Sequence, residues 1–196
     1  MSREKLKQLI DKSDGYITTK EAKSYGIHRE YLSLFVKEDS LIRVSNGIYQ
    51  KPNTWDDFLF EFQKKKKRLI YSHDTALFLH GLSDREPIKY SVTLPTGYNT
   101  SQINNDKIVA YTIKKGLFDL GGTKINTIYG NEIVVYDVER TICDVIRSRN
   151  KLDNNLVNES IKKYVKSQNK DLIKLMQYAN SLGIQNVVKK YMEILL

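Results

Sequence analysis

The sequence predicts a mixed α/β (α+β) chain of 196 residues in two unequal units. Three observations predict this fold. Residues 15–49 combine a helix-start signal, an amphipathic segment and an Asn-Gly turn. Residues 88–136 contain short segments of alternating polarity, which are typical of strands, and residues 137–195 repeat apolar side chains at helical spacing. A small helical unit with a hairpin is therefore expected before a larger α+β unit.

The first unit is expected to open with a helix over residues 3–12, whose apolar face closes a small core. Thr18 and Glu21 form the Ser/Thr-x-x-Glu capping box, in which two otherwise unpaired backbone N–H groups are satisfied at a helix start. This second helix begins at about residue 19 and ends by Gly26, which adopts a left-handed conformation without steric cost.

A third helix is predicted over residues 28–37, because Leu32, Phe35 and Val36 recur at helical spacing. After it, alternating residues 41–44 lead into Asn46-Gly47, a dipeptide suited to a type I′ hairpin turn. Two short helices followed by a hairpin make a winged helix-turn-helix. The side chains of the third helix that face outward are His28, Arg29, Ser33 and Lys37.

Such a unit suits DNA, because the major groove admits one α-helix while the hairpin, or wing, can lie along the neighbouring backbone. Arg29 and His28 are placed to reach base edges, and Thr19 and Lys20 to contact a phosphate. The predicted DNA-binding residues are Thr19, Lys20, His28, Arg29, Ser33, Lys37, Arg43 and Ser45. Two other interpretations remain open: a merely solvated helix surface, and a winged helix that docks a protein.

The charge balance also favours a polyanionic partner. The net charge is +9 and the pI about 9.4, so binding to nucleic acid should weaken with salt. Both units share the positive excess. The single cysteine, Cys143, indicates a reducing compartment, and no apolar run reaches the roughly 20 residues of a membrane span. A cytoplasmic protein is expected.

The expected division is a winged helix-turn-helix domain over residues 1–52, a basic linker helix over 53–68 and an α+β domain over 69–196. Residues 54–63 are aromatic-rich with helical spacing, and five consecutive cations follow at 64–68. This cationic run is either a solvated hinge or a further phosphate contact, and the sequence leaves both interpretations open.

The last unit is expected to contain a mixed, antiparallel-rich sheet and a C-terminal helical bundle. Strands are predicted at residues 88–94, 108–113, 124–129 and 132–136, and helices at 72–81, 137–147, 156–167, 172–182 and 185–195. Gly121-Gly122 reads as a turn, because no Gly-Lys-Ser/Thr follows it.

Asp137, Glu139 and Asp144 raise the question of chemistry, because clustered carboxylates can hold magnesium in nucleases. The same residues suit a capped helix with an Arg140–Asp144 pair, and this structural interpretation is favoured. No metal site is expected at His73 and His80, which lack further ligands. We therefore expect no catalytic residues and no cofactor, with a nucleic-acid-modifying enzyme or nuclease as the alternative.

The segments YSHDTALFLHGLSD, VTLP, KKGLFDLGGTKI and above all YDVERTICDVIRSR, together with the winged unit, resemble the AbiEi antitoxin family. These proteins are regulators from bacterial AbiE abortive-infection systems, which are type IV toxin–antitoxin systems that give phage resistance. The resemblance covers nearly the whole chain.

The resemblance implies a winged helix-turn-helix that represses transcription of its own operon by binding inverted repeats in double-stranded DNA. It also implies that residues 69–196 form an antitoxin domain, which counters a nucleotidyltransferase toxin without a stable complex. No membrane partner is expected, and monomers can bind cooperatively on DNA. Charge alone points to one further antitoxic or DNA-contacting basic face: Lys162, Lys163, Lys166, Lys189 and Lys190.

Overall fold

The computed structural model describes residues 2–13, 15–66, 68–103, 105 and 107–195. These residues group into two compact units. The first spans residues up to 67 together with 126–133, and the second spans residues 68–125 together with 134 onward. Residues 126–133 thus belong to the first unit although they follow its main segment by some sixty residues. No local sequence pattern indicates this discontinuity.

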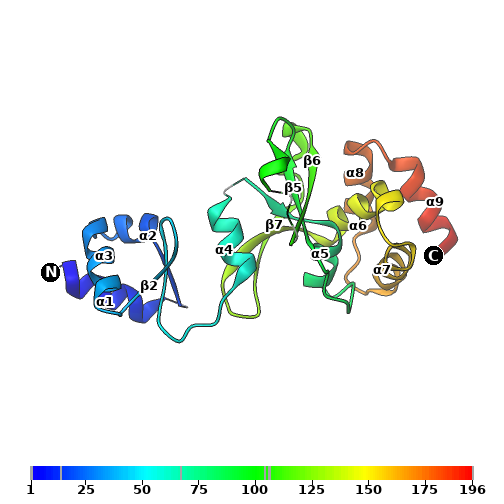
Figure 1. The fold of residues 1–196 in the computed structure, drawn as a ribbon. Helices are drawn as coiled ribbons and strands as arrows, with labels where there is room; N and C mark the ends of the chain where they lie inside the picture. Colours follow the sequence, from blue (N-terminus) through cyan, green and yellow to red (C-terminus); the bar gives the residue numbers. More distant parts are fainter. Residues whose placement is uncertain (1, 14, 67, 104, 106, 196) are drawn as a thin grey trace. The chain divides into compact units, whose positions relative to one another are not determined.

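The first unit contains the predicted helix-turn-helix and hairpin (Figure 1). Its elements are α1 (Ser2–Lys12), β1 (Tyr16–Thr18), α2 (Thr19–Ser24), α3 (Arg29–Lys37), β2 (Ile42–Ser45), β3 (Ile48–Gln50) and α4 (Phe58–Lys65). The three strands form an antiparallel sheet in the order β1-β3-β2. Leu6, Leu32, Phe35 and Tyr49 are buried together in its core, which confirms the predicted inward face of α3.

The hairpin between β2 and β3 differs from the expected type I′ turn. That turn needs a positive φ at both central residues. Gly47 has a φ of 80°, but Asn46 is not among the residues with positive φ, and the strand register shifts between Arg43 and Ser45. Ser45 still pairs with Ile48 across the two-residue connection, so the turn is of another type than I′, and a bulge lies in β2 before it.

Helix α4 begins at Phe58, four residues later than the aromatic spacing predicts, because Asp57 is its N-cap. The Asp57 Oδ1 atom accepts a hydrogen bond from the Phe60 N–H at 3.1 Å, while Oδ2 accepts bonds from Thr127 and Asn131. The predicted cationic run starts in the last turn of α4; its member Lys67 lies outside the described residues.

The second unit carries a mixed sheet and the C-terminal helices. Its helices and strands are β4 (Ile70–Tyr71), α5 (His73–Leu79), β5 (Tyr90–Pro95), β6 (Ile108–Ile113), β7 (Gly122–Asn126), β8 (Glu132–Tyr136), α6 (Val138–Arg147), α7 (Asn154–Lys166), α8 (Leu172–Ser181) and α9 (Gln185–Leu195). Short 3-10 turns lie at Thr100–Gln102, Lys115–Leu117 and Arg149–Lys151, named η1, η2 and η3.

The strand order is β6-β5-β4-β8-β7. Strands β5 and β6 pair in parallel, as do β4 and β8, whereas β4 and β5 are antiparallel. The mixed sheet agrees with the expected α+β class. The two-residue strand β4, which the sequence did not predict, lies at the centre of this order because distant partners on both sides satisfy its backbone.

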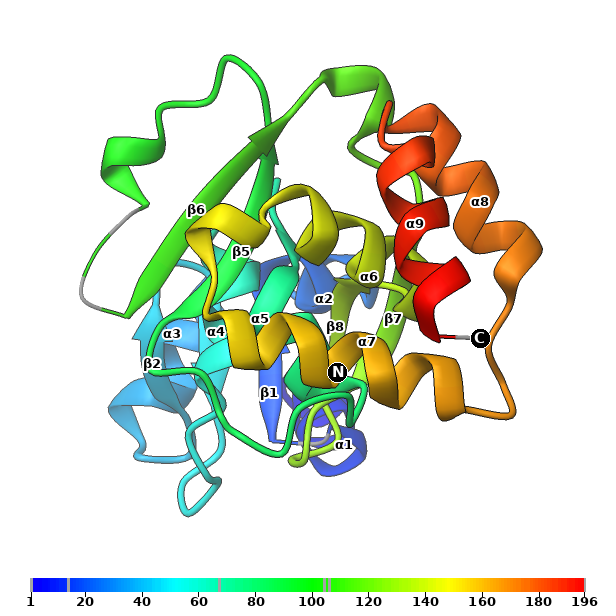
Figure 2. The ribbon, with the colours of Figure 1, turned by 90° about the vertical axis from the view of Figure 1, so that its right-hand side faces the viewer.

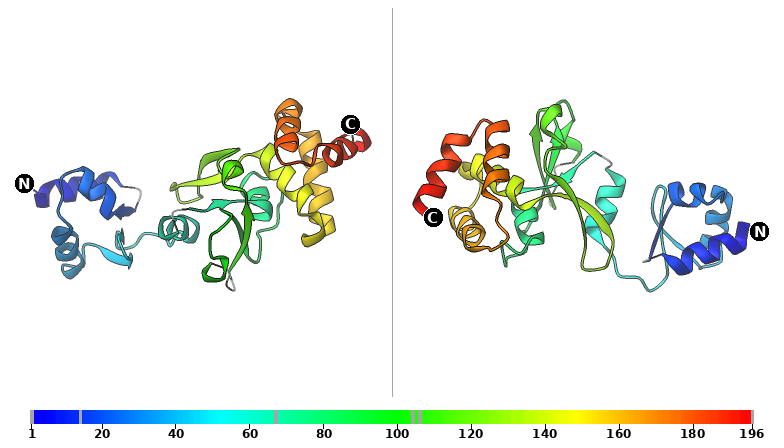
Figure 3. Two further views of the ribbon diagram at one scale, coloured as in Figure 1. Left: turned by 90° about the horizontal axis from the view of Figure 1, so that it is seen from above. Right: turned by 180° about the vertical axis from the view of Figure 1, so that it is seen from behind.

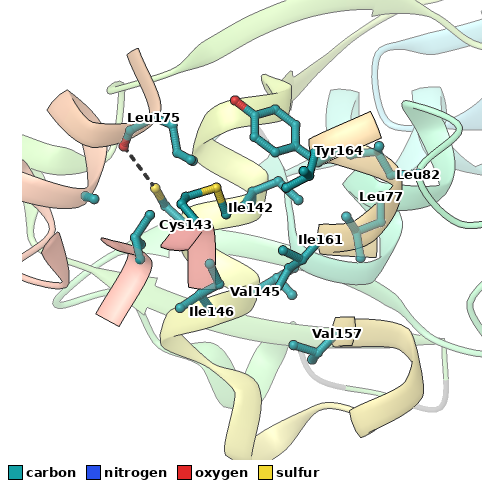
Figure 4. Packing of buried hydrophobic residues seen from close by; sticks show 14 residues of the cluster. Leu77, Leu82, Ile142, Cys143, Val145, Ile146, Val157, Ile161, Tyr164 and Leu175 are labelled. Atoms are coloured by element: carbon teal, nitrogen blue, oxygen red, sulfur yellow. Dashed lines mark hydrogen bonds between the residues drawn. The ribbon is translucent and has the colours of Figure 1, made fainter. Parts of the chain in front are cut away.

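Helix α6 is the centre of the second core, and α5, α7, α8 and α9 all contact it (Figures 2 and 3). Every residue from Glu139 to Ile146 is buried. Figure 4 shows Ile142, Val145 and Ile146 packed with side chains of α7. The Cys143 thiol lies 3.6 Å from the Leu175 carbonyl oxygen, and burial raises its pKa to about 12. Cys143 is therefore a small core residue.

Among the residues that the structure describes, no helix is long and apolar enough to cross a membrane.

Candidate nucleic-acid interface

The outward face of α3 is open to solvent. Arg29, Ser33 and Lys37 are all exposed and follow one another at four-residue intervals, so they form a row about 12 Å long on one side of the helix. Leu32 and Phe35, on the opposite side, are 0% and 2% exposed. The core thus fixes the rotation of α3 and presents a row with two cations to a ligand.

His28 is the N-cap of α3, but its side chain makes no capping hydrogen bond. Its imidazole is exposed, so the ring remains available to a ligand at the start of the helix. Glu30, in the first turn, is exposed beside it. The first turn of α3 therefore offers both the Arg29 guanidinium and the Glu30 carboxylate. Base edges present hydrogen-bond donors as well as acceptors, so this combination suits them better than it suits phosphates alone.

The tip of the wing lies next to the start of α2. The Thr19 N–H donates to the Gly47 carbonyl oxygen at 2.9 Å, which joins helix and hairpin. A Cβ atom on Gly47 would lie 3.1 Å from the Thr19 hydroxyl oxygen, so the close approach and the positive φ both favour glycine there. The wing is thereby held in a defined position against α2.

A hollow of about 370 Å³ lies where α2, the wing and α4 meet. Two exposed cations, Lys20 and Lys64, line it. Its other lining residues are Thr18, Thr19, Asn46, Gly47, Ile48 and Gln63. The Lys64 ammonium also lies 4.9 Å from the centre of the Phe60 ring, a cation–π contact that orients it. The sequence does not distinguish Lys64 from its neighbours, because a run of cations carries no information on which member faces a site.

The wing residues differ in how far they are available. The exposed Arg43 donates to the Asn46 side-chain oxygen at 3.2 Å. Ser45 is half-buried, and its hydroxyl oxygen is buried without a hydrogen-bond partner among the described residues. Arg43 is consequently the better-placed phosphate contact of the two.

The three carboxylates near the start of α6 each have a structural partner. Asp137 caps the helix through the Arg140 N–H and also pairs with Lys174, whose ammonium lies 2.9 Å away. Glu139 lies 3.4 Å from the same ammonium, and Asp144 is buried between Arg140 and Arg147 at 3.0 and 2.8 Å. No group of three or more His, Cys, Asp or Glu residues suited to a metal ion occurs within the described part of the chain. This geometry supports the capped-helix interpretation.

The two histidines of the second unit are also held by neighbours. His73 is buried between the hydroxyls of Ser72 and Ser148, and His80 lies 2.7 Å from the Tyr136 carbonyl oxygen. Both ring nitrogens of His73 and the Nε2 atom of His80 therefore contact protein groups.

The predicted basic face of the second unit lies on α7 and α9. Lys162, Lys166 and Lys190 are exposed, whereas Lys163 pairs with Asp84 at 2.7 Å and Lys189 with Glu193 at 3.7 Å. Two of its five cations are thus partly neutralised by neighbours.

Taken together, the first unit is a winged helix-turn-helix with an open cationic row on its third helix. Residues 4–51 match the family model described as "Transcriptional regulator, AbiEi antitoxin". The match spans about a quarter of the chain and confirms the predicted resemblance for the winged unit.

No curated protein matches the chain. The crystal structure of the RV2827C protein from Mycobacterium tuberculosis is similar at a TM-score of 0.46 and 10% sequence identity, covering 98% of this chain and 80% of that one.

Proposed function

We propose that this protein is the antitoxin of a type IV abortive-infection system and a repressor of its own operon. The observation that carries the proposal is the solvent-exposed row Arg29, Ser33 and Lys37 within a segment that matches an antitoxin regulator family. In the proposed complex, α3 enters the major groove at each inverted repeat, and the wing and the Lys20–Lys64 hollow contact phosphates. One copy on each half-site is the expected arrangement, with cooperation between neighbouring copies.

The proposal separates base contacts from phosphate contacts, and a pair of variants tests this division. Arg29→Ala removes a base contact and should cost about 1–3 kcal/mol on the operator while relaxing sequence preference. Lys20→Ala should weaken binding to all duplexes about equally and lower the salt slope by about one unit. Fluorescence anisotropy with the DNA upstream of the gene and with a shuffled duplex, at several salt concentrations, measures both effects.

Lys7→Ala serves as the charge-matched control, because Lys7 is an exposed cation on α1 outside the proposed interface. If Arg29→Ala leaves the ratio of operator to shuffled binding unchanged, α3 does not read the sequence. If Lys7→Ala weakens binding as much as Lys20→Ala, net charge explains the affinity and the proposed phosphate contact fails.

We further propose that the second unit counters a nucleotidyltransferase toxin without binding it stably. Co-expression with the toxin encoded in the same operon should restore growth, while purified antitoxin and toxin should elute separately. Arg29→Ala should lose repression of a reporter but keep the rescue, because the altered side chain belongs to the DNA interface. Loss of both functions by this variant would contradict a division of labour between the units.

A further inference from the structure

The second unit contains a polar hollow that the proposed function does not use. Its volume is about 600 Å³, within the range of sites that hold small molecules. One wall of the hollow is formed by β6, and the other by the segment in which α6 ends and η3 begins. Its lining residues are Val109, Ala110, Tyr111, Thr112, Arg147, Ser148, Asn150 and Lys151.

The charge of this hollow is positive. Arg147 and Lys151 line it, and no carboxylate occurs among those of its lining residues that the structure describes. Asp144, the buried carboxylate that contacts Arg147, is shared between Arg140 and Arg147, so one negative charge lies between two guanidinium groups. The buried cluster therefore keeps a net positive charge beside the hollow, which favours an anionic ligand.

Arg147 offers part of its guanidinium to the hollow. Its Nη2 atom bonds to Asp144 at 2.8 Å, and its Nε atom is buried without a hydrogen-bond partner among the described residues, so neither is free for a ligand. The side chain is nevertheless 28% exposed and lines the hollow, so the rest of the guanidinium is open to an anion. Phosphate oxygens accept charge-assisted hydrogen bonds from such a group, and the exposed Lys151 ammonium would be a second point charge for the same phosphate.

An aromatic platform forms another wall. The Tyr111 ring, which lines the hollow, stacks on the His73 imidazole with ring centres 3.6 Å apart and planes 15° apart. His73 is fixed by Ser72 and Ser148, which lie 2.9 and 3.0 Å from its ring nitrogens. Its backbone is held at a φ of 50°, a conformation that costs energy for a residue other than glycine. The platform is thus rigid, as suits stacking of a base.

A second hollow shares Val109, Tyr111 and Lys151 but is also lined by Asp74, Glu86 and Asp153. Their carboxylates would repel a phosphate. The anionic end of a ligand is accordingly expected in the first hollow, next to Arg147.

We propose that this hollow binds a nucleoside phosphate, with its phosphate on Arg147 and Lys151 and its base against Tyr111. The group can belong to a free nucleotide or to the 5′-phosphorylated end of a strand, since both present the same chemistry. The proposal is independent of operator binding, because every residue it uses lies in the second unit.

Isothermal titration of the full-length protein with AMP, GMP and inorganic phosphate tests the proposal. We expect one saturable site for a nucleotide and weaker binding of inorganic phosphate, which lacks the base. Lys151→Gln should weaken nucleotide binding about tenfold through loss of a charge-assisted contact. Lys7→Gln, which changes an exposed cation on α1 that does not line the hollow, should leave nucleotide binding unchanged.

Arg147→Lys keeps the charge but removes the planar guanidinium that lines the hollow, so it should also weaken nucleotide binding. The melting temperature of this variant reports whether the core is intact. A 5′-phosphorylated dinucleotide compared with its 5′-hydroxyl form separates the two sources. Tighter binding of the phosphorylated dinucleotide than of AMP assigns the site to strand ends, and the reverse assigns it to free nucleotides. Absence of nucleotide binding at millimolar concentration, equal affinities for nucleotide and inorganic phosphate, or binding insensitive to both Lys151→Gln and Arg147→Lys would overturn the proposal.

Discussion

At the scale of single residues, two arginines of α6, Arg140 and Arg147, share one buried carboxylate, that of Asp144. Arg140 has no solvent exposure; its Nε bonds to Asp144, and its Nη1 donates to the carbonyl oxygens of Leu117 and Leu120 at 3.0 and 2.6 Å. Its guanidinium also lies 4.1 Å from the centre of the Tyr136 ring. The sequence predicts the i,i+4 pair of Arg140 and Asp144, but it does not predict that Arg147 shares the same carboxylate.

Asp144→Asn tests this dependence. The change keeps the shape of the side chain but leaves two guanidinium groups without their counterion, so the second unit should lose about 3–5 kcal/mol of stability. Denaturant unfolding followed by circular dichroism measures the loss. Asp84→Asn, which breaks the exposed pair with Lys163, should change stability by less than about 1 kcal/mol. Equal effects of the two substitutions would show that the buried cluster contributes no more than a surface pair.

His73 gives the second unit a pH dependence of defined sign. Burial is the largest cause that lowers the pKa of His73, from 6.5 to about 4. The nearby Asp144 opposes this shift, whereas the cations Arg147, Arg140 and Lys151 add to it. The unfolded chain therefore binds more protons than the folded chain between these values. Stability from neutral His73 is complete above about pH 6.5 and decreases as the pH falls toward 4.

The variant His73→Asn should remove this dependence, since asparagine tolerates a positive φ but does not titrate. The stability difference between wild type and variant should change by about 3 kcal/mol from pH 7 to pH 4. Urea unfolding at several pH values gives this difference. A constant difference across the range would mean that His73 does not have a lowered pKa.

At the scale of elements, the short helix α2 depends on its cap. The Glu21 N–H donates to the Thr18 hydroxyl oxygen at 3.1 Å, and the Thr18 N–H donates to the Glu21 carboxylate at 2.7 Å. A helix of six residues has few internal hydrogen bonds, so these two contribute a large share of its stability.

We expect Thr18→Ala to lower the stability of the winged unit by about 1 kcal/mol, because it leaves the Glu21 N–H without its acceptor. Thermal unfolding monitored by circular dichroism measures the change. Lys23→Ala, an exposed substitution in the same helix, should have an effect within about 0.5 kcal/mol. If the two variants melt alike, the capping box does not stabilise the helix measurably.

The elements that the sequence predicts well are those with local causes. The capping box marks the start of α2, and the spacing of Leu32, Phe35 and Val36 gives the rotation of α3 correctly. The sequence does not predict strand β4, because a strand of two residues is too short to show an alternation of polar and apolar side chains. Its pairing partners, β5 and β8, are also distant in the chain. The turn at Asn46-Gly47 differs from the predicted type I′, because only its second central residue, Gly47, has a positive φ. At the candidate interface, exposure of Arg29 and Lys37 follows from the pattern, whereas the Lys20–Lys64 hollow requires tertiary packing.

At the scale of the whole molecule, the first unit is not a continuous stretch of sequence. Asp57 is 2% exposed, and its Oδ2 atom is paired by Thr127 and Asn131, which are encoded about seventy residues later. The Tyr16 hydroxyl accepts from the Asp57 N–H at 2.8 Å and donates to Glu61 at 2.9 Å, linking β1 to the same network. The network therefore joins three segments of the chain.

A fragment of residues 1–67 should melt at a lower temperature than the same unit in the full chain, because the Asp57 carboxylate would lose both downstream donors. In the full-length protein, Thr127→Val should reproduce part of this loss, about 1.5–3 kcal/mol for a hydrogen bond to a charged group. Differential scanning calorimetry of the fragment, the variant and the wild type makes the comparison. Identical melting of the winged unit in all three would show that residues 126–133 do not contribute to it.

The discontinuous first unit also has a consequence for the order of events during translation. Domains usually fold as they emerge from the ribosome, beginning with the one synthesised first. Here the segment that completes the partners of Asp57 extends to residue 133, so the nascent chain must run well into the second unit before the first can reach its final form. The larger unit and the smaller one thus mature over the same interval, instead of one after the other.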